Sequence, residues 1–65
     1  MSAQKAAMVT YMKSTGLVQY VDEYQRIFDE LIREHDSDLQ EGRPPLPLVA
    51  IPGRAWTVLM RQVSE

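Results

Sequence analysis

The fold of this chain is decided by residues 17–35, LVQYVDEYQRIFDELIREH. Side chains that favour burial recur there in steps of three and four residues: Leu17, Tyr20, Val21, Tyr24, Ile27, Phe28, Leu31, Ile32 and His35. That spacing places them on one side of a helix, so the stretch predicts one long amphipathic α-helix. The opposite side carries three expected i,i+4 ion pairs, each worth only about 0.2–0.5 kcal/mol, namely Asp22 with Arg26, Arg26 with Glu30, and Asp29 with Arg33.

Shorter helices are predicted on both sides of this stretch. Apolar residues recur at helical spacing within residues 3–14. Gly16 suits the position just after a helix end, and a bend inside one longer helix is the alternative. Residues 36–51, DSDLQEGRPPLPLVAI, lose that periodicity and predict a proline-rich linker whose last residues are extended. Pro52 is well placed as the first residue of a last helix, residues 52–63. We therefore expect one all-α domain over residues 1–65, with the long helix packed roughly antiparallel to the C-terminal helix and the N-terminal helix completing or extending the bundle.

The size of the chain leads us to expect a partner. A domain of 65 residues buries only about 60% of the surface that its unfolded chain exposes, and the sequence has no cysteine and a single histidine to supply a disulfide or a metal staple. Oligomerisation remains as the usual way to add stability. We expect the apolar seam of residues 17–35 to be too large for this chain to cover alone, with Tyr20 and Tyr24 at a subunit interface.

Charge and hydropathy exclude several classes of function. The net charge is −2, and the acidic residues crowd into the middle of the chain without any basic stripe, so we do not expect the monomer to bind DNA directly. Apolar residues never run unbroken for the eighteen or more positions of a membrane helix, and the N-terminal residues lack a secretory signal. These features predict a cytoplasmic protein.

The sequence offers no set of residues suited to catalysis, to a cofactor or to a metal. Its one histidine, His35, is expected at the end of the long helix, where the helix dipole favours a cationic imidazole. Residues 34–38, EHDSD, supply ligand atoms but no convergence, and no glycine-rich phosphate loop is present. The run RPPLP, residues 43–47, is open to two interpretations, a proline-rich ligand or, as we favour, a simple linker. We expect a protein that is not an enzyme.

Two segments together resemble phage terminase small subunits. Residues 45–65, PLPLVAIPGRAWTVLMRQVSE, are similar to the stretch in which a proline–leucine pair opens a helix carrying an alanine and a large aromatic residue. Residues 16–35, GLVQYVDEYQRIFDELIREH, resemble the long amphipathic helix that precedes a glycine- and proline-containing loop. The resemblance implies a helical, ring-forming oligomer that recognises viral DNA and hands it to the ATP-driven large subunit. It implies helix-packing and subunit-contact positions at Tyr20, Tyr24, Ile27, Phe28, Leu31, Trp56 and Leu59.

Two functions follow as expectations. The first is a non-enzymatic oligomerising adaptor that resembles the core of a terminase small subunit, acts in DNA packaging in the cytoplasm of a bacterial host, and has the large subunit as a protein partner. Family members are longer and carry upstream DNA-binding helices, whereas fifteen residues precede Gly16 here. The alternative is a small regulatory or inhibitory protein whose acidic helix side, with Asp22, Asp29 and Glu30, engages a basic surface on another protein.

Overall fold

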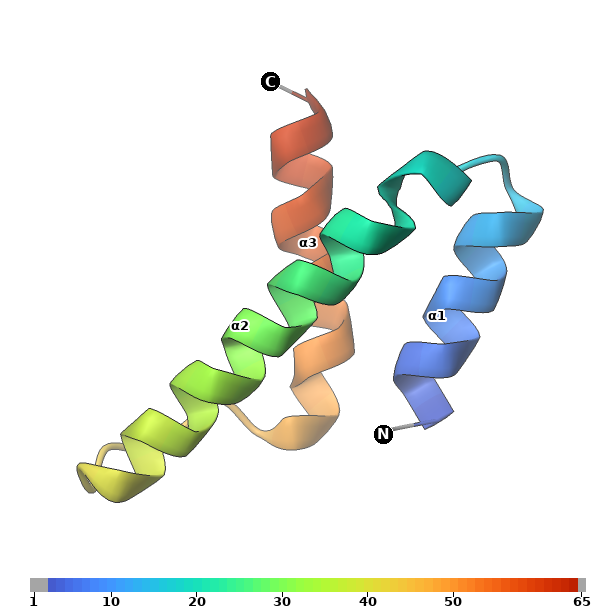
Figure 1. Cartoon of the computed structure of the whole chain (residues 1–65). Coiled ribbons are helices and arrows are strands. Elements are labelled where there is room, and N and C mark those ends of the chain that lie inside the picture. Colours follow the sequence, from blue (N-terminus) through green and yellow to red (C-terminus); the bar gives the residue numbers. More distant parts are fainter. Residues whose placement is uncertain (1–2, 65) are drawn as a thin grey trace.

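The chain forms three α-helices, which confirms the predicted all-α class. The computed structural model describes residues 3–64. Helix α1 spans Ala3–Ser14, α2 spans Val21–Gln40 and α3 spans Ile51–Ser64, while short 3-10 turns occupy Val18–Tyr20 (η1) and Leu48–Ala50 (η2). In Figure 1, α2 runs opposite to α3 and crosses in front of it, and α1 lies beside them with the direction of α3. The predicted antiparallel pairing of the long and C-terminal helices is therefore observed.

All three helices contribute to one core. It consists of Met12 from α1, then Val21, Tyr24, Ile27 and Phe28 from α2, and Ile51, Ala55 and Leu59 from α3. The α3 residues are four apart, so they form one stripe, and the small side chain of Ala55 leaves room for α2 at its centre. A hydrogen bond of 3.2 Å from the Tyr24 hydroxyl to the Pro52 carbonyl oxygen joins the two helices inside this core.

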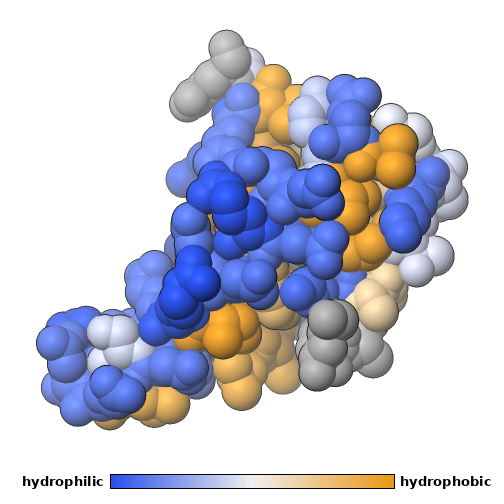
Figure 2. Space-filling model, in the orientation of Figure 1, coloured by the Kyte–Doolittle hydropathy of each residue, from blue (hydrophilic) through white to orange (hydrophobic). Residues whose placement is uncertain are grey.

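The seam of α2 is covered differently from our expectation. We expected it to exceed what one chain could cover, but over its first half, from Val21 to Phe28, the chain's own α1 and α3 bury it. In the second half, Leu31 and Ile32 are only half-buried and Leu39 is 57% exposed. Figure 2 shows the outward side of α2 as hydrophilic, with hydrophobic residues emerging along its lower edge.

Glycines end both α1 and α2. Gly16 and Gly42 have φ values of 81° and 74°, in the left-handed region that costs glycine nothing. The residue after each glycine donates its N–H to a carbonyl five positions earlier, as the Schellman motif requires, from Leu17 to Met12 and from Arg43 to Asp38, both at 2.9 Å. The predicted role of Gly16 as the residue just after a helix is confirmed.

The long helix ends later than predicted, and this corrects the linker boundaries. We expected the helix over residues 17–35 and the linker over 36–51, whereas α2 spans Val21–Gln40 after the η1 turn. The helix continues to Gln40 because Gly42, two residues later, supplies the left-handed residue that ends it. Arg43 then hydrogen-bonds Asp38 at 2.8 Å and pairs with Glu41. The hydrogen bond with Asp38 raises the pKa of Arg43 above its ordinary value. Residues 48–50 form the η2 turn instead of the predicted extended segment.

Candidate interaction surface

An open apolar groove lies between α1 and α3. Its lining residues are Ala7, Met8 and Tyr11 from α1 and Pro52 and Trp56 from α3, around a volume of about 450 Å³. We call it the α1/α3 groove. On each helix these residues lie next to the residues that form the core. Met8 is one helical turn from the buried Met12 on α1, and Pro52 directly follows the buried Ile51 on α3. The groove is therefore a continuation of the core that the chain leaves open.

Two aromatic rings form the centre of this groove. The rings of Tyr11 and Trp56 meet edge to face, with centroids 6.1 Å apart and an interplanar angle of 75°. Tyr11 is 52% exposed, while Trp56 is half-buried. Edge-to-face contacts of this kind contribute about 0.5–1.5 kcal/mol beyond the buried area, so the pair holds α1 against α3 while presenting aromatic surface outward.

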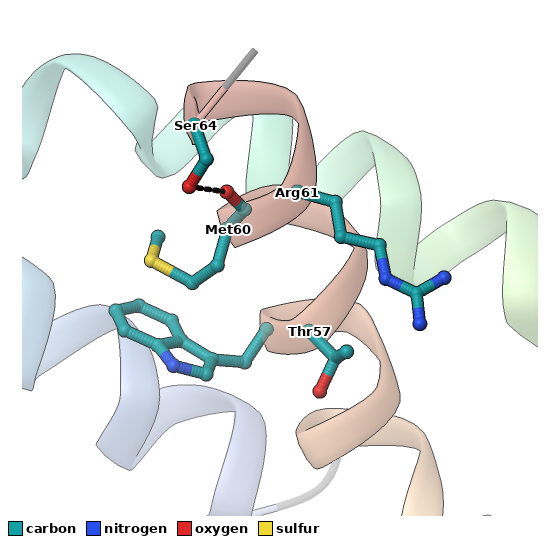
Figure 3. A pocket seen from close by; sticks show the side chains of 5 residues that line it. Thr57, Met60, Arg61 and Ser64 are labelled. Atoms are coloured by element: carbon teal, nitrogen blue, oxygen red, sulfur yellow. Dashed lines mark hydrogen bonds between the residues drawn. The ribbon is translucent and has the colours of Figure 1, made fainter.

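A second hollow adjoins the groove at Trp56. It runs along α3 over about 510 Å³ and is lined by Trp56, Thr57, Met60, Arg61 and Ser64. Figure 3 shows the Met60 thioether pointing toward the indole ring and the Arg61 guanidinium extending to the other side of the helix. The Ser64 hydroxyl donates to the Met60 carbonyl oxygen at 2.8 Å and so serves the helix itself. The hollow thus has a flexible apolar floor at Trp56 and Met60, while the charge of Arg61 lies on the other side of α3.

The structure separates the seven predicted interface residues into two groups. Tyr24, Ile27, Phe28 and Leu59 lie in the core of the single chain and leave little surface for a second subunit. Tyr20, Leu31 and Trp56 are half-buried, and of these only Trp56 lines the α1/α3 groove. The helix-packing role of the first group is observed, whereas the subunit-contact role of the seven residues stays a prediction.

The predicted acidic binding residues are partly engaged within the chain. Asp22, Asp29 and Glu30 are exposed, but Asp29 lies 3.5 Å from the Lys5 ammonium of α1 and Glu30 lies 2.6 Å from Arg26. The Arg26–Glu30 pair was predicted. The predicted pairs Asp22–Arg26 and Asp29–Arg33 were wrong, because Arg26 pairs with Glu23 and Asp29 pairs with Lys5 of α1. The Lys5 ammonium also lies 4.8 Å above the Phe28 ring.

The contact between Arg26 and Glu23 shifts the pKa of both side chains. The side-chain hydrogen bond from Arg26 lowers the pKa of Glu23, and the hydrogen bond and charge of Glu23 raise the pKa of Arg26. Both side chains are well exposed, so solvent screens the pair and its contribution to stability is small.

His35 has a structural role that the sequence did not reveal. The residue lies inside α2, five positions before its end, which corrects the expected position at the helix C-terminus. Its Nδ1 is 2.8 Å from the Leu46 carbonyl oxygen, and because a carbonyl oxygen only accepts, Nδ1 carries the proton. The imidazole therefore fastens the returning loop to α2.

The proline-rich run is held by the same contact. Pro45 and Leu46 are half-buried, whereas Pro44 and Pro47 are exposed, so the RPPLP segment lies against α2 on one side. This placement favours a role as a linker over a role as a ligand.

Within residues 3–64, no group of three or more histidine or acidic side chains could hold a metal ion. No helix in that part of the chain is long and apolar enough to cross a membrane. Comparison with known protein families, with curated proteins and with solved structures finds no match to this chain.

Proposed function

We propose that this chain is a non-enzymatic adaptor that works by self-assembly, with the α1/α3 groove as part of its contact surface. The observation that carries the proposal is the open groove around Tyr11 and Trp56, in a chain that buries the first half of α2 almost completely. Tryptophan, tyrosine and methionine are the residues enriched where protein interfaces are driest. A small domain also gains stability when such a groove is covered.

The resemblance to phage terminase small subunits supplies the specific task in this proposal. Residues 16–65 carry that resemblance, and it makes DNA packaging the process and the terminase large subunit the protein partner. Direct contact with DNA is not part of the proposal, because the net charge is −2 and α2 is strongly acidic.

The oligomeric state tests the proposal. Size-exclusion chromatography with light scattering at micromolar concentration is expected to give a multiple of the 7.5 kDa chain mass. Tyr11→Ser is expected to shift the mass toward one chain, because it removes an aromatic ring from the groove. Val49→Ser is the matched control, since Val49 is 76% exposed but lies in η2, away from the groove lining. A single-chain mass for the unaltered protein over that range contradicts the proposal.

A regulatory protein that binds through α2 is the second candidate. Helix α2 carries the carboxylates Asp22, Glu23, Asp29, Glu30, Glu34, Asp36 and Asp38 against only two arginines, which favours a basic partner surface. This function predicts a salt-sensitive complex with another protein. Binding that survives replacement of Asp22, Asp29 and Glu30 by lysine excludes the α2 face as the contact.

A further inference from the structure

Helix α1 contributes least to the core of this chain. Within residues 5–14, Met12 is the one buried apolar side chain, whereas α2 supplies four core residues and α3 supplies three. Figure 1 shows α1 to one side of the crossed pair of α2 and α3, joined to α2 by the loop that contains Gly16. The pair also has a link of its own, the hydrogen bond from the Tyr24 hydroxyl to the Pro52 carbonyl oxygen. Helices α2 and α3 therefore pack against each other directly, and α1 covers one side of that packing.

A buried lysine holds the N-terminal half of α1 against α2. Lys5 is 7% exposed, and its ammonium lies 3.5 Å from Asp29 Oδ1 and 4.8 Å from the centroid of the Phe28 ring. We call these three residues the lysine clasp. Lysine is almost never buried to this extent unless its charge is paired. The side chain of Asp29 is 59% exposed, so dissolved salt reaches the carboxylate and screens its attraction for Lys5.

Helix α1 is too short to persist without these contacts. It has 12 residues, and isolated helices shorter than about 12–15 residues are only marginally stable in water. Once its contacts with α2 and α3 are lost, α1 is therefore expected to unfold. The helix thus has two states, docked and helical or released and unfolded, as expected for a segment that opens locally.

We propose that α1 is a releasable lid on the pair of α2 and α3, and that the lysine clasp sets how often this lid opens. Opening uncovers the Phe28 ring, which the Lys5 ammonium faces, and the Trp56 ring, which Tyr11 contacts. It also takes the α1/α3 groove apart, because residues of both helices line that groove. The lid belongs to the single chain, so it does not depend on the proposed self-assembly.

The charge of Lys5 makes the lid responsive to salt. Replacing a buried ion pair by apolar residues of similar volume often leaves a protein equally stable or more stable, whereas removing one partner strands the other charge. Lys5→Met keeps an unbranched apolar side chain beside the Phe28 ring and is expected to hold the lid closed without the ion pair. Asp29→Asn strands the Lys5 ammonium and is expected to open the lid more often.

Amide hydrogen exchange followed by mass spectrometry, at one pH and at about 0.05 and 0.5 M NaCl, tests the lid. The reporters are the amides of residues 7–14, which lie beyond the first four N–H groups of α1 and so bond within the helix. In the unaltered protein they are expected to exchange faster than the core amides of α2 and α3. Higher salt is expected to speed their exchange about 3-fold and to leave the core amides unchanged.

The clasp variants separate this ion pair from general effects of salt. At low salt, Asp29→Asn is expected to speed exchange of residues 7–14 about 3-fold or more, and Lys5→Met is expected to remove the salt dependence. The matched controls are Lys13→Met on α1 and Asp36→Asn on α2, both at exposed positions outside the clasp. Each control is expected to exchange as the unaltered protein does at both salt concentrations.

The outcomes distinguish the lid from the proposed function. If residues 7–14 and the core amides exchange through one common opening, the chain unfolds as a unit and the lid is overturned. If residues 7–14 open separately but Lys5→Met keeps the full salt dependence, the clasp does not control the opening and the proposal is overturned. A single-chain mass at every concentration contradicts self-assembly and leaves the lid in place, because the exchange is measured on the single chain.

Discussion

Tyr24→Phe tests the buried connection between α2 and α3. Tyr24 is 0% exposed, its ring centroid lies 6.2 Å from that of Phe28, and its hydroxyl donates to the Pro52 carbonyl oxygen at 3.2 Å. Phenylalanine keeps the ring and removes only this hydrogen bond. The carbonyl oxygen of Pro52 is also within reach of the helical N–H four residues later, so it is not left without a donor. We therefore expect the free energy of unfolding to fall by about 0.5–1.5 kcal/mol at neutral pH, toward the lower end.

The same residue makes stability depend on alkaline pH. Burial raises the pKa of the Tyr24 phenol above its ordinary value of 10.0. The unfolded chain then releases this proton at a lower pH than the folded chain, so the contribution of Tyr24 is fully present below about pH 10 and is lost as pH rises through the folded-state pKa. Above about pH 10, the difference in stability between the unaltered protein and Tyr24→Phe is expected to narrow.

Urea unfolding followed by circular dichroism at neutral and alkaline pH measures both effects. Tyr11→Phe is the matched control, because Tyr11 is 52% exposed and its hydroxyl is not in the core. Tyr11→Phe is expected to lose as much free energy of unfolding above about pH 10 as the unaltered protein does. If Tyr24→Phe loses the same amount, the buried phenol of Tyr24 is not the cause of the loss.

Three further predictions use the same unfolding assay. Gly53 lies in α3 with nothing within 4 Å of an added Cβ, so Gly53→Ala should raise the free energy of unfolding by about 0.5–1 kcal/mol. Gly16 is equally uncrowded but has a φ of 81°, so Gly16→Ala should lower the free energy of unfolding by about 1–2 kcal/mol, and equal effects at both sites would contradict this conformational explanation. Leu59→Ala should lower the free energy of unfolding by about 2–5 kcal/mol because Leu59 is 1% exposed. Leu48→Ala, at an exposed site, should change it by no more than about 0.5 kcal/mol. His35→Ala should lower the free energy of unfolding by about 1 kcal/mol and speed amide exchange at Glu41, Gly42, Arg43 and Leu46, the residues of this loop that carry an amide hydrogen. Unchanged exchange there would show that the imidazole does not hold the loop.

Periodicity predicted the helices because burial sets the spacing of apolar residues. The stripe of residues 17–35 contains all four core residues of α2, and α3 begins at Ile51, one residue before the predicted start at Pro52. The end of α2 was missed because acidic and polar residues follow His35 and hide the helical pattern. Gly42 was the available signal, since a helix can run until a residue that readily takes positive φ.

The interaction surface was predicted poorly for a different reason. Periodicity shows that a side chain is buried, but it does not show whether the covering surface belongs to the same chain or to another. Of the two tyrosines expected at an interface, Tyr24 is covered from within the chain and belongs to the core, whereas Tyr20 is half-buried. The signal for the α1/α3 groove is a second stripe beside each core stripe, with Ala7 and Tyr11 four apart on α1 and Pro52 and Trp56 four apart on α3.

Coverage of the α2 seam by α1 and α3 makes the folding core of this chain distinct from the α1/α3 groove, the surface of the proposed assembly. Had the first half of α2 been the contact surface, any change that blocked assembly would also have removed the core, as Phe28→Ala would at about 3–5 kcal/mol. The α1/α3 groove instead includes residues such as Ala7 and Tyr11, whose side chains are exposed and lie outside the buried core. Under the proposed function, a change of salt or protein concentration is therefore expected to alter association while each copy stays folded.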